Sequence, residues 1–268
     1  MPAVLSALLA ALISLAPEYA AALGKSEPLH PGFTFERRDL PSLATGVTKE
    51  TAGRIAAAPR EFLELLRRVM DGSQDLVVLV DKAHSLAKTS EPPDLVPLAE
   101  DALTQGRSGL RLREMLIADL RAMAEAARAE GVTLQVSSAY RSYQYQEKLF
   151  ADDLKKRSRE EVLRDLAQPG HSQHQLGTAM DFGSIDPSFA ATPAGRWLLV
   201  NALRFGFSLS YPDGQERVTG YAYEPWHYRY VGRDAASLIG GFFGGSQQDF
   251  LAWYADRHSF LAAHRRNR

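Results

Sequence analysis

Two short motifs of this 268-residue chain place histidines and carboxylates at spacings that suit a metal-dependent hydrolysis. His174 and Asp181 are seven residues apart, and Gly177 between them lets the chain turn back, so both side chains can reach one divalent ion. A second motif holds His227, with Glu224 three residues upstream. Two imidazoles and one carboxylate leave a fourth zinc position open for water, as in catalytic zinc sites. A carboxylate outside the ligand set can then take a proton from that water.

Spacing alone leaves alternatives at this site. His171 lies three residues before His174 and could be the ligand instead. Each residue also has an ordinary structural role available, as a turn histidine, a helix cap or an ion-paired carboxylate. On a regular strand, residues three apart point to opposite faces, so Glu224 and His227 converge only if Pro225 marks a break in the strand.

Composition narrows the chemistry further. Hydrophobic residues make up 45% and charged residues 24% of the chain, which is typical of a soluble globular protein. The net charge of −1 provides no basic field for nucleic acid, so we expect no nucleic-acid partner. Cysteine is absent, which excludes disulfides, thiolate catalysis and cysteine-ligated metals. Any metal must therefore be held by His, Asp or Glu, and the chain has only seven histidines.

The beginning of the chain predicts export. An apolar run over residues 3–16 stops at Pro17 and is shorter than the ~20 residues of a membrane-spanning helix. Small residues follow it, as in a secretory signal, although no basic residue precedes Lys25; the alternative is an amphipathic or buried helix. We expect a signal or leader in residues 1–24, a linker or arm in 25–53 and the catalytic domain in 54–268. The mature chain would then act in the periplasm or cell envelope, with no integral membrane span.

Helices and strands alternate along the rest of the chain and must position the motifs. Apolar spacing, capping residues and turn residues predict helices over 59–72, 112–131 and 193–206, and others that begin at 158 and 246. Short apolar or alternating runs predict strands over 76–80 and 132–136, and Asp181 lies on a further strand that enters the core. This order of elements favours a single α+β domain.

Three motifs, taken in order, also carry a family likeness. Residues 172–181 (SQHQLGTAMD) match S-x-H-x-x-G-x-A-x-D, and residues 224–227 (EPWH) match E-x-W-H. Residues 138–142 (SAYRS) match an S-x-Y-R-S element that precedes them. Together they resemble the VanY-type D-alanyl-D-alanine carboxypeptidases, zinc peptidases that trim peptidoglycan stem peptides. The likeness extends from about residue 76 to residue 231.

The resemblance implies a fold and a metal centre. The fold would be a small antiparallel sheet flanked by helices, of the hedgehog and D,D-peptidase type, forming one catalytic domain. One Zn²⁺ per chain would be held by His174, Asp181 and His227, which resolves the choice against His171. Glu224 would be the general base that activates the attacking water.

The resemblance also implies the substrate contacts. Arg141 would bind the substrate and polarise the scissile carbonyl, for which a planar guanidinium is well suited. Gln146 and Ser172 match positions that contact the substrate backbone or carboxylate, and Trp226 would form a wall of the pocket. The partner would be a peptidoglycan stem peptide, and the sequence favours a monomer without fixing the oligomeric state.

The expected activity is removal of the terminal D-alanine from stem peptides. An L,D-carboxypeptidase, a D,D-dipeptidase or an endopeptidase would share the same site and differ in the loops at its rim. A non-catalytic zinc module, such as the hedgehog signalling domain, is the alternative from another class. The presence of both Arg141 and Glu224 opposes it, because a structural zinc needs neither a base nor an oxyanion partner.

Overall fold

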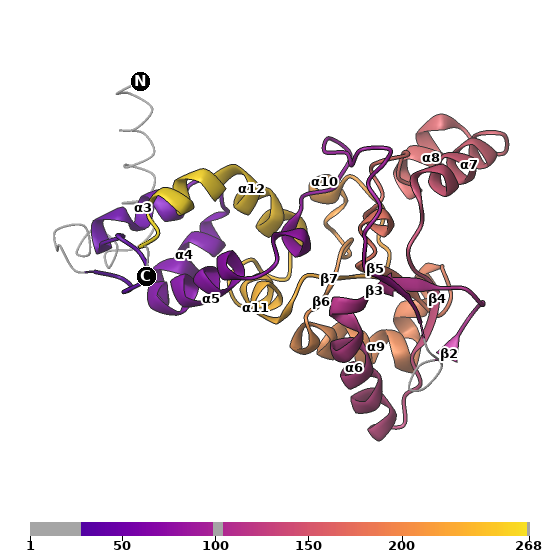
Figure 1. Ribbon diagram of the computed structural model, residues 1–268, viewed down its shortest axis with the longest axis horizontal. Helices are drawn as coiled ribbons and strands as arrows, with labels where there is room; N and C mark the ends of the chain where they lie inside the picture. The colour runs from indigo at the N-terminus through magenta and orange to yellow at the C-terminus, as the bar shows by residue number, and fades with distance from the viewer. Residues whose placement is uncertain (1–27, 99–103, 267–268) are drawn as a thin grey trace.

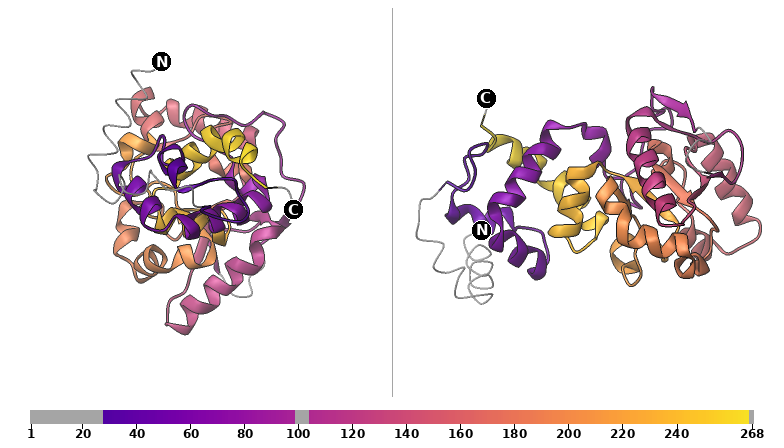
Figure 2. Two further views of the ribbon diagram at one scale, coloured as in Figure 1. Left: turned by 90° about the vertical axis from the view of Figure 1, so that its left-hand side faces the viewer. Right: turned by 90° about the horizontal axis from the view of Figure 1, so that it is seen from below.

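The chain folds into two lobes that lie next to each other along its long axis (Figure 1). The computed structural model describes residues 28–98 and 104–266, so the predicted leader, residues 1–24, lies outside the described residues. One lobe is helical, and the other contains the main sheet. Seen from below, the same two lobes follow one another along the molecule (Figure 2).

The sheet lobe is built on five strands in the order β2-β4-β5-β7-β6. Strands β4, β5, β7 and β6 pair antiparallel, whereas β2 joins the edge in parallel with β4. The strands of this sheet are β2 (Thr104–Gln105), β4 (Gln135–Ser138), β5 (Ala179–Phe182), β6 (Phe207–Leu209) and β7 (His227–Tyr230). A separate antiparallel pair joins β1 (Leu95–Pro97) to β3 (Arg111–Arg113). The predicted small antiparallel sheet with flanking helices is confirmed, with β2 as a parallel addition.

Alternation along β5 and β7 separates the core from the site. Met180, Phe182, Tyr228 and Tyr230 point into an apolar core that also contains side chains from the helices beneath the sheet. Asp181 occupies the alternate position on β5 and therefore points to the other face. The helices that supply this core are α6 (Ile117–Ala129) and α9 (Pro193–Asn201). Helices α7 (Tyr143–Leu154), α8 (Arg159–Asp165) and α10 (Glu216–Thr219) complete the lobe.

The helical lobe has its own core, formed by both ends of the described chain. Phe33 and Phe35 pack in it with Phe62, Ile239 and Phe250. The lobe consists of α3 (Leu40–Leu43), α4 (Lys49–Ala57), α5 (Pro59–Asp71), α11 (Arg233–Gly241) and α12 (Gln247–Ala263). The range that we expected to be a linker or arm, residues 25–53, thus contains α3 and the start of α4 and contributes buried side chains to this core.

Local signals identified several of these helices. The predicted helix over 59–72 is α5, and the one over 193–206 is α9 continued by a 3-10 turn (Ala202–Phe205) that ends at Gly206. The predicted starts at 158 and 246 are confirmed, because Ser158 and Ser246 cap α8 and α12 with their hydroxyls. Within the described ranges, none of the helices has both the length and the apolar stretch that crossing a membrane requires.

Two expectations about the elements are wrong. Residues 76–80 do not form a strand: a 3-10 helix covers Gln74–Val77, and the chain then runs extended outside any sheet. The carbonyls of Leu76 and Val78 instead accept hydrogen bonds from Nη2 of the buried Arg229, at 3.0 and 2.8 Å. The long helix begins at Ile117 rather than 112, because Leu112 lies in β3. In both cases an apolar residue is buried, and burial alone does not distinguish helix from strand.

Candidate active site

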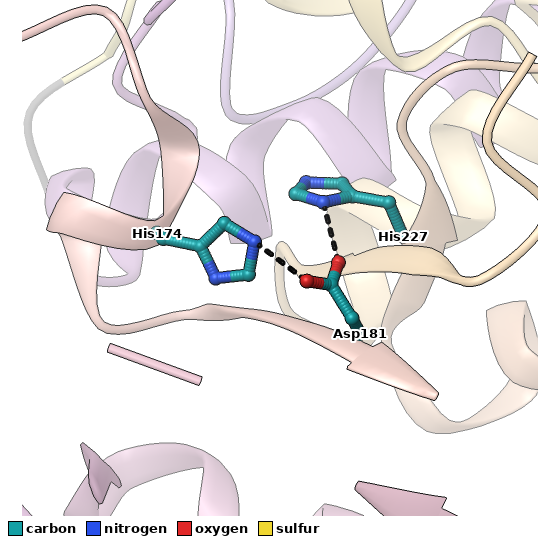
Figure 3. Close-up of side chains that lie close together, drawn as sticks. All are labelled: His174, Asp181 and His227. Atoms are coloured by element: carbon teal, nitrogen blue, oxygen red, sulfur yellow. Dashed lines mark hydrogen bonds and ion pairs between the residues drawn. The ribbon is translucent and has the colours of Figure 1, made fainter. Parts of the chain in front are cut away.

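The three predicted ligands come from one turn and two neighbouring strands (Figure 3). A 3-10 helix, η4 (Gln173–Leu176), carries His174, and Ser172 caps it by accepting a hydrogen bond from the His174 amide at 3.3 Å. Asp181 lies on β5 directly opposite His227 on β7. The antiparallel register therefore brings two of the side chains together, and the turn at Gly177 brings the third.

The ligand atoms of these residues lie within 4.8 Å of one another, and all three side chains are buried. Asp181 contacts His174 Nε2 at 3.2 Å through Oδ2 and His227 Nδ1 at 2.9 Å through Oδ1. His174 Nδ1 lies 2.7 Å from the carbonyl oxygen of Ala139. Because a carbonyl only accepts, Nδ1 carries the hydrogen and Nε2 keeps its lone pair for the site. Two imidazole nitrogens and a carboxylate, with a hydrogen-bonded outer partner, fit Zn²⁺.

Electrostatics keep His174 and Asp181 in the protonation states that a metal requires. Burial, with the positive charge of Arg141, lowers the pKa of His174 to about 4, so its ring is neutral at neutral pH. Burial opposes ionisation of Asp181, but its contacts with His174 and His227 outweigh burial and hold the pKa of this carboxyl well below its ordinary value. A neutral imidazole and an ionised carboxylate are the forms that bind a metal.

Glu224 reaches the same cluster through a turn. The chain turns at Pro225 just before β7 begins, and the His227 amide donates to the carbonyl oxygen of Glu224 at 3.1 Å. This is the break that convergence of the two residues requires. Glu224 Oε2 lies 3.7 Å from His227 Nδ1. Burial, with the negative charge of Asp181, raises the pKa of Glu224 well above its ordinary value, which suits a group that accepts and returns a proton.

Arg141 lies against the ligands, just before α7. Its Nη2 is 3.0 Å from both Asp181 Oδ2 and His174 Nε2. Ser138 accepts hydrogen bonds from the same guanidinium at 3.2–3.3 Å. The cluster therefore combines the positive charge of a guanidinium with a carboxylate outside the ligand set.

The other predicted substrate residues line the same pocket, which has a volume of about 210 Å³. Gln146 is buried, and both polar atoms of its amide form hydrogen bonds. Oε1 accepts from Arg141 Nη1 at 3.3 Å, and Nε2 donates to the carbonyl oxygen of Ala167 at 2.7 Å. Ser172 caps the turn that carries His174. Trp226 lines the pocket and packs on the core of the sheet lobe. Substrate contact by these residues stays a prediction.

The structure also decides between His171 and His174, which spacing in the sequence could not do. His171 lies outside the cluster, with Nδ1 2.8 Å from the carbonyl oxygen of Asp81.

Tyr211 and Tyr221 form a wall of the pocket that sequence reasoning missed, with ring centres 4.8 Å apart. The Tyr211 ring centre lies 4.9 Å from that of His227. A lone aromatic residue carries no motif that a single sequence reveals.

Gly177 is required by the turn that joins His174 to Asp181. Its φ is +69°, and an added Cβ would lie 2.9 Å from Leu95 Cδ2 and 3.0 Å from Arg113 Cγ. We expect Gly177→Ala to lower the free energy of unfolding by about 2 kcal/mol, combining left-handed strain with these close contacts. Urea denaturation measures the change.

Gly131 provides the matched control for this substitution. Its φ is +76°, but an added Cβ would meet nothing within 4 Å. Gly131→Ala should therefore show the backbone strain alone, a loss of about 1 kcal/mol. Equal losses in the two variants would mean that the contacts around Gly177 contribute nothing.

Comparison with known proteins places the chain in a family. Residues 109–233 match the family described as "VanY: D-alanyl-D-alanine carboxypeptidase". The chain is 31% identical over 173 residues to the bifunctional D-Ala-D-Ala dipeptidase and carboxypeptidase VanXYC of Enterococcus gallinarum, covering 60% of this chain and 86% of that one. The chain belongs to the VanY family. The earlier resemblance is confirmed by these matches.

Solved structures extend the VanY comparison to the fold. The LdcB LD-carboxypeptidase, whose structure concerns peptidoglycan recognition, aligns with a TM-score of 0.61 at 32% identity, over 66% of this chain and 86% of that one. A mutant of the vancomycin-resistance D,D-pentapeptidase VanY in complex with Zn(II) aligns at 0.55 with 30% identity, over 66% and 99%. VanYB in complex with D-Ala-D-Ala gives the same score and identity, over 66% and 97%.

Two further relatives of this VanY-family chain match it over only part of their length. YodJ of Bacillus subtilis is 36% identical over 173 residues, which is 62% of this chain and 63% of that protein. A D-alanyl-D-alanine carboxypeptidase of Enterococcus faecalis is 35% identical over 146 residues, 51% and 54% of the two chains. This chain thus spans less than two thirds of either relative.

Proposed function

We propose that this protein is a zinc-dependent D,D-carboxypeptidase that removes the terminal D-alanine from peptidoglycan stem peptides. The observation that carries the proposal is the meeting of His174, Asp181 and His227 in one pocket, with Glu224 and Arg141 beside them. Relatives named D-alanyl-D-alanine carboxypeptidase and a VanY structure with Zn(II) support it. VanYB was solved with D-Ala-D-Ala, which supports a D,D substrate.

The protein groups divide the chemistry between them. Zn²⁺ at His174, Asp181 and His227 would supply a Lewis acid and lower the pKa of a bound water towards ~7. Glu224 accepts the proton of the attacking water and returns it to the leaving amine. Arg141 donates to the carbonyl oxygen as negative charge develops there. The buried walls around the cluster strengthen both interactions by excluding solvent.

A second activity shares this site. The LdcB LD-carboxypeptidase aligns with the chain at a TM-score of 0.61, which favours L,D-carboxypeptidase activity as the alternative. The two activities differ in the stereochemistry of the residue before the scissile bond, and therefore in the length of stem peptide that is trimmed.

We also propose where the protein acts and on what. A relative named D-alanyl-D-alanine carboxypeptidase supports extracytoplasmic action, and the apolar run over residues 3–16 would direct export. The partner is the stem peptide of peptidoglycan, and we propose that the protein acts on it as a monomer.

Amino-acid release from synthetic stem peptides tests the proposal. We expect the zinc-loaded protein to release D-alanine from a pentapeptide and nothing from a tetrapeptide. A chelator should abolish release, and added Zn²⁺ should restore it. Release from the tetrapeptide alone would select L,D activity. No release from either peptide by the zinc-loaded protein would contradict both activities.

A further inference from the structure

A line of buried polar side chains runs from the back of His227 to the helical lobe. His227 Nε2 lies 3.3 Å from Gln173 Oε1, which also accepts a hydrogen bond from Ser210 Oγ at 2.7 Å. Ser210 Oγ in turn accepts from Gln247 Nε2 at 3.1 Å. Gln173, Ser210 and Gln247 are each 1–2% exposed, so water does not compete for these bonds.

The direction of these hydrogen bonds indicates which ring nitrogen of His227 carries the hydrogen. The Ser210 hydroxyl has one hydrogen, and because it accepts from Gln247 it gives that hydrogen to Gln173 Oε1. The amide oxygen of Gln173 only accepts, so a hydrogen bond to it requires the ring hydrogen of His227 on Nε2. His227 Nδ1, 2.9 Å from Asp181 Oδ1, can then present its lone pair to a metal ion that it shares with Asp181.

The members of this line come from different parts of the fold. Gln173 belongs to η4, one residue before His174, and Ser210 directly follows β6. Gln247 is the first residue of α12, in the helical lobe. It lies outside residues 109–233, the range that matches the VanY family. The helical lobe therefore contributes a side chain to the surroundings of the metal centre.

We propose that Gln173 is a positioning residue, held by Ser210 and Gln247, that orients His227 and selects Nδ1 as its metal-binding nitrogen. The inference rests on the metal site of the proposed function. Histidine ligands generally donate their second ring hydrogen to a nearby acceptor, and loss of that acceptor costs about 10–100-fold in metal affinity. Gln173 supplies the acceptor for His227, as the Ala139 carbonyl does for His174.

Competition with a chromophoric zinc chelator, on the full chain, is the first test. We expect Gln173→Leu to weaken zinc binding by about 10–100-fold, because the ring hydrogen loses its acceptor. Gln173→Glu should restore affinity, since a carboxylate oxygen accepts from both His227 and Ser210. Gln175→Leu is the matched control: Gln175 is equally buried on the same turn, but it donates to the carbonyls of Ala87 and Ser90.

Substitution of Ser210, the second residue of this line, tests whether zinc affinity depends on the hydrogen bonds or only on packing. Ser210→Ala should weaken zinc binding by severalfold, because Gln173 loses the donor that holds it. Ser208→Ala should leave affinity unchanged, since this hydroxyl, two residues away and 1% exposed, makes no hydrogen bond among the described residues. Gln247→Leu should resemble Ser210→Ala.

The ring hydrogen gives a signature that a structural role would not produce. In the zinc-loaded natural chain, ¹⁵N NMR should show a His227 Nε2 hydrogen that exchanges slowly with water because Gln173 accepts it, and in Gln173→Leu this hydrogen should exchange faster. Equal zinc affinity and equal exchange in the natural chain and Gln173→Leu would overturn the inference while leaving the proposed function intact. Failure of the natural chain to bind zinc would instead remove the metal site itself.

Discussion

Glu224→Gln should leave zinc bound and lower turnover by about 10²–10⁴-fold, the usual contribution of a general base. Glutamine has nearly the same shape, but its amide cannot accept a proton at neutral pH. Glu224 lies outside the three-ligand cluster, with Oε2 3.7 Å from His227 Nδ1, so metal binding should persist. Measurement of kcat on a pentapeptide, together with the zinc content of the purified variant, checks both halves of this expectation.

A second glutamate provides the control for charge alone. Glu216 is exposed at the start of α10 and lines no part of the site pocket. Glu216→Gln removes the same charge and should keep kcat close to that of the natural chain. Near-normal hydrolysis by Glu224→Gln would remove Glu224 from the mechanism, whereas loss of zinc would make it a ligand rather than a base.

Asp181→Asn should abolish both zinc binding and activity. The carboxylate is 1% exposed and contacts both histidines and Arg141. Loss of a ligand should reduce zinc affinity by more than the roughly 100-fold upper range for an outer partner. Removing one member of a buried charge pair also destabilises by about 3–5 kcal/mol. Chelator competition and urea denaturation measure the two effects separately.

Asp186→Asn controls for the loss of a carboxylate nearby in the chain. Asp186 is exposed and caps a short 3-10 helix five residues after Asp181. Its substitution should leave zinc affinity unchanged and cost at most about 1 kcal/mol, the typical value of a cap. Zinc binding by Asp181→Asn at the level of the natural chain would contradict the proposed ligand set.

The sequence predicted the parts of the site that depend on local geometry. A turn at Gly177 and the register of two adjacent strands bring together residues that are close in sequence or lie in recognisable motifs. Spacing could not choose between His171 and His174, because that choice depends on Asp81, 90 residues from His171. The contacts of Gln173 with Ser210 and His227 span 37 and 54 residues, so no local pattern reveals them.

In the fold, too, the elements set by local signals were predictable and those set by distant partners were not. Capping residues identified α8, α9 and α12, because a cap is a local hydrogen bond. Pro59 at the first helical position identified α5. The role of residues 28–57 was not predictable, since their partners lie near the other end of the chain: Thr34 donates to the carbonyl oxygen of His264 at 2.8 Å. The apolar run over 76–80 predicts a strand, and no local pattern corrects this, because its true partner, Arg229, is about 150 residues away.

The joining of both ends of the described chain in one core limits how this protein can be shortened. Phe33 forms a bridge with Arg265, and the core between them contains Phe62 and Trp253. Deletion from one side alone would therefore expose apolar surface of this core, whereas removal of both segments would leave the sheet lobe with its own core. Such a fragment would lack Gln247, so the surroundings of His227 would differ from those in the whole protein.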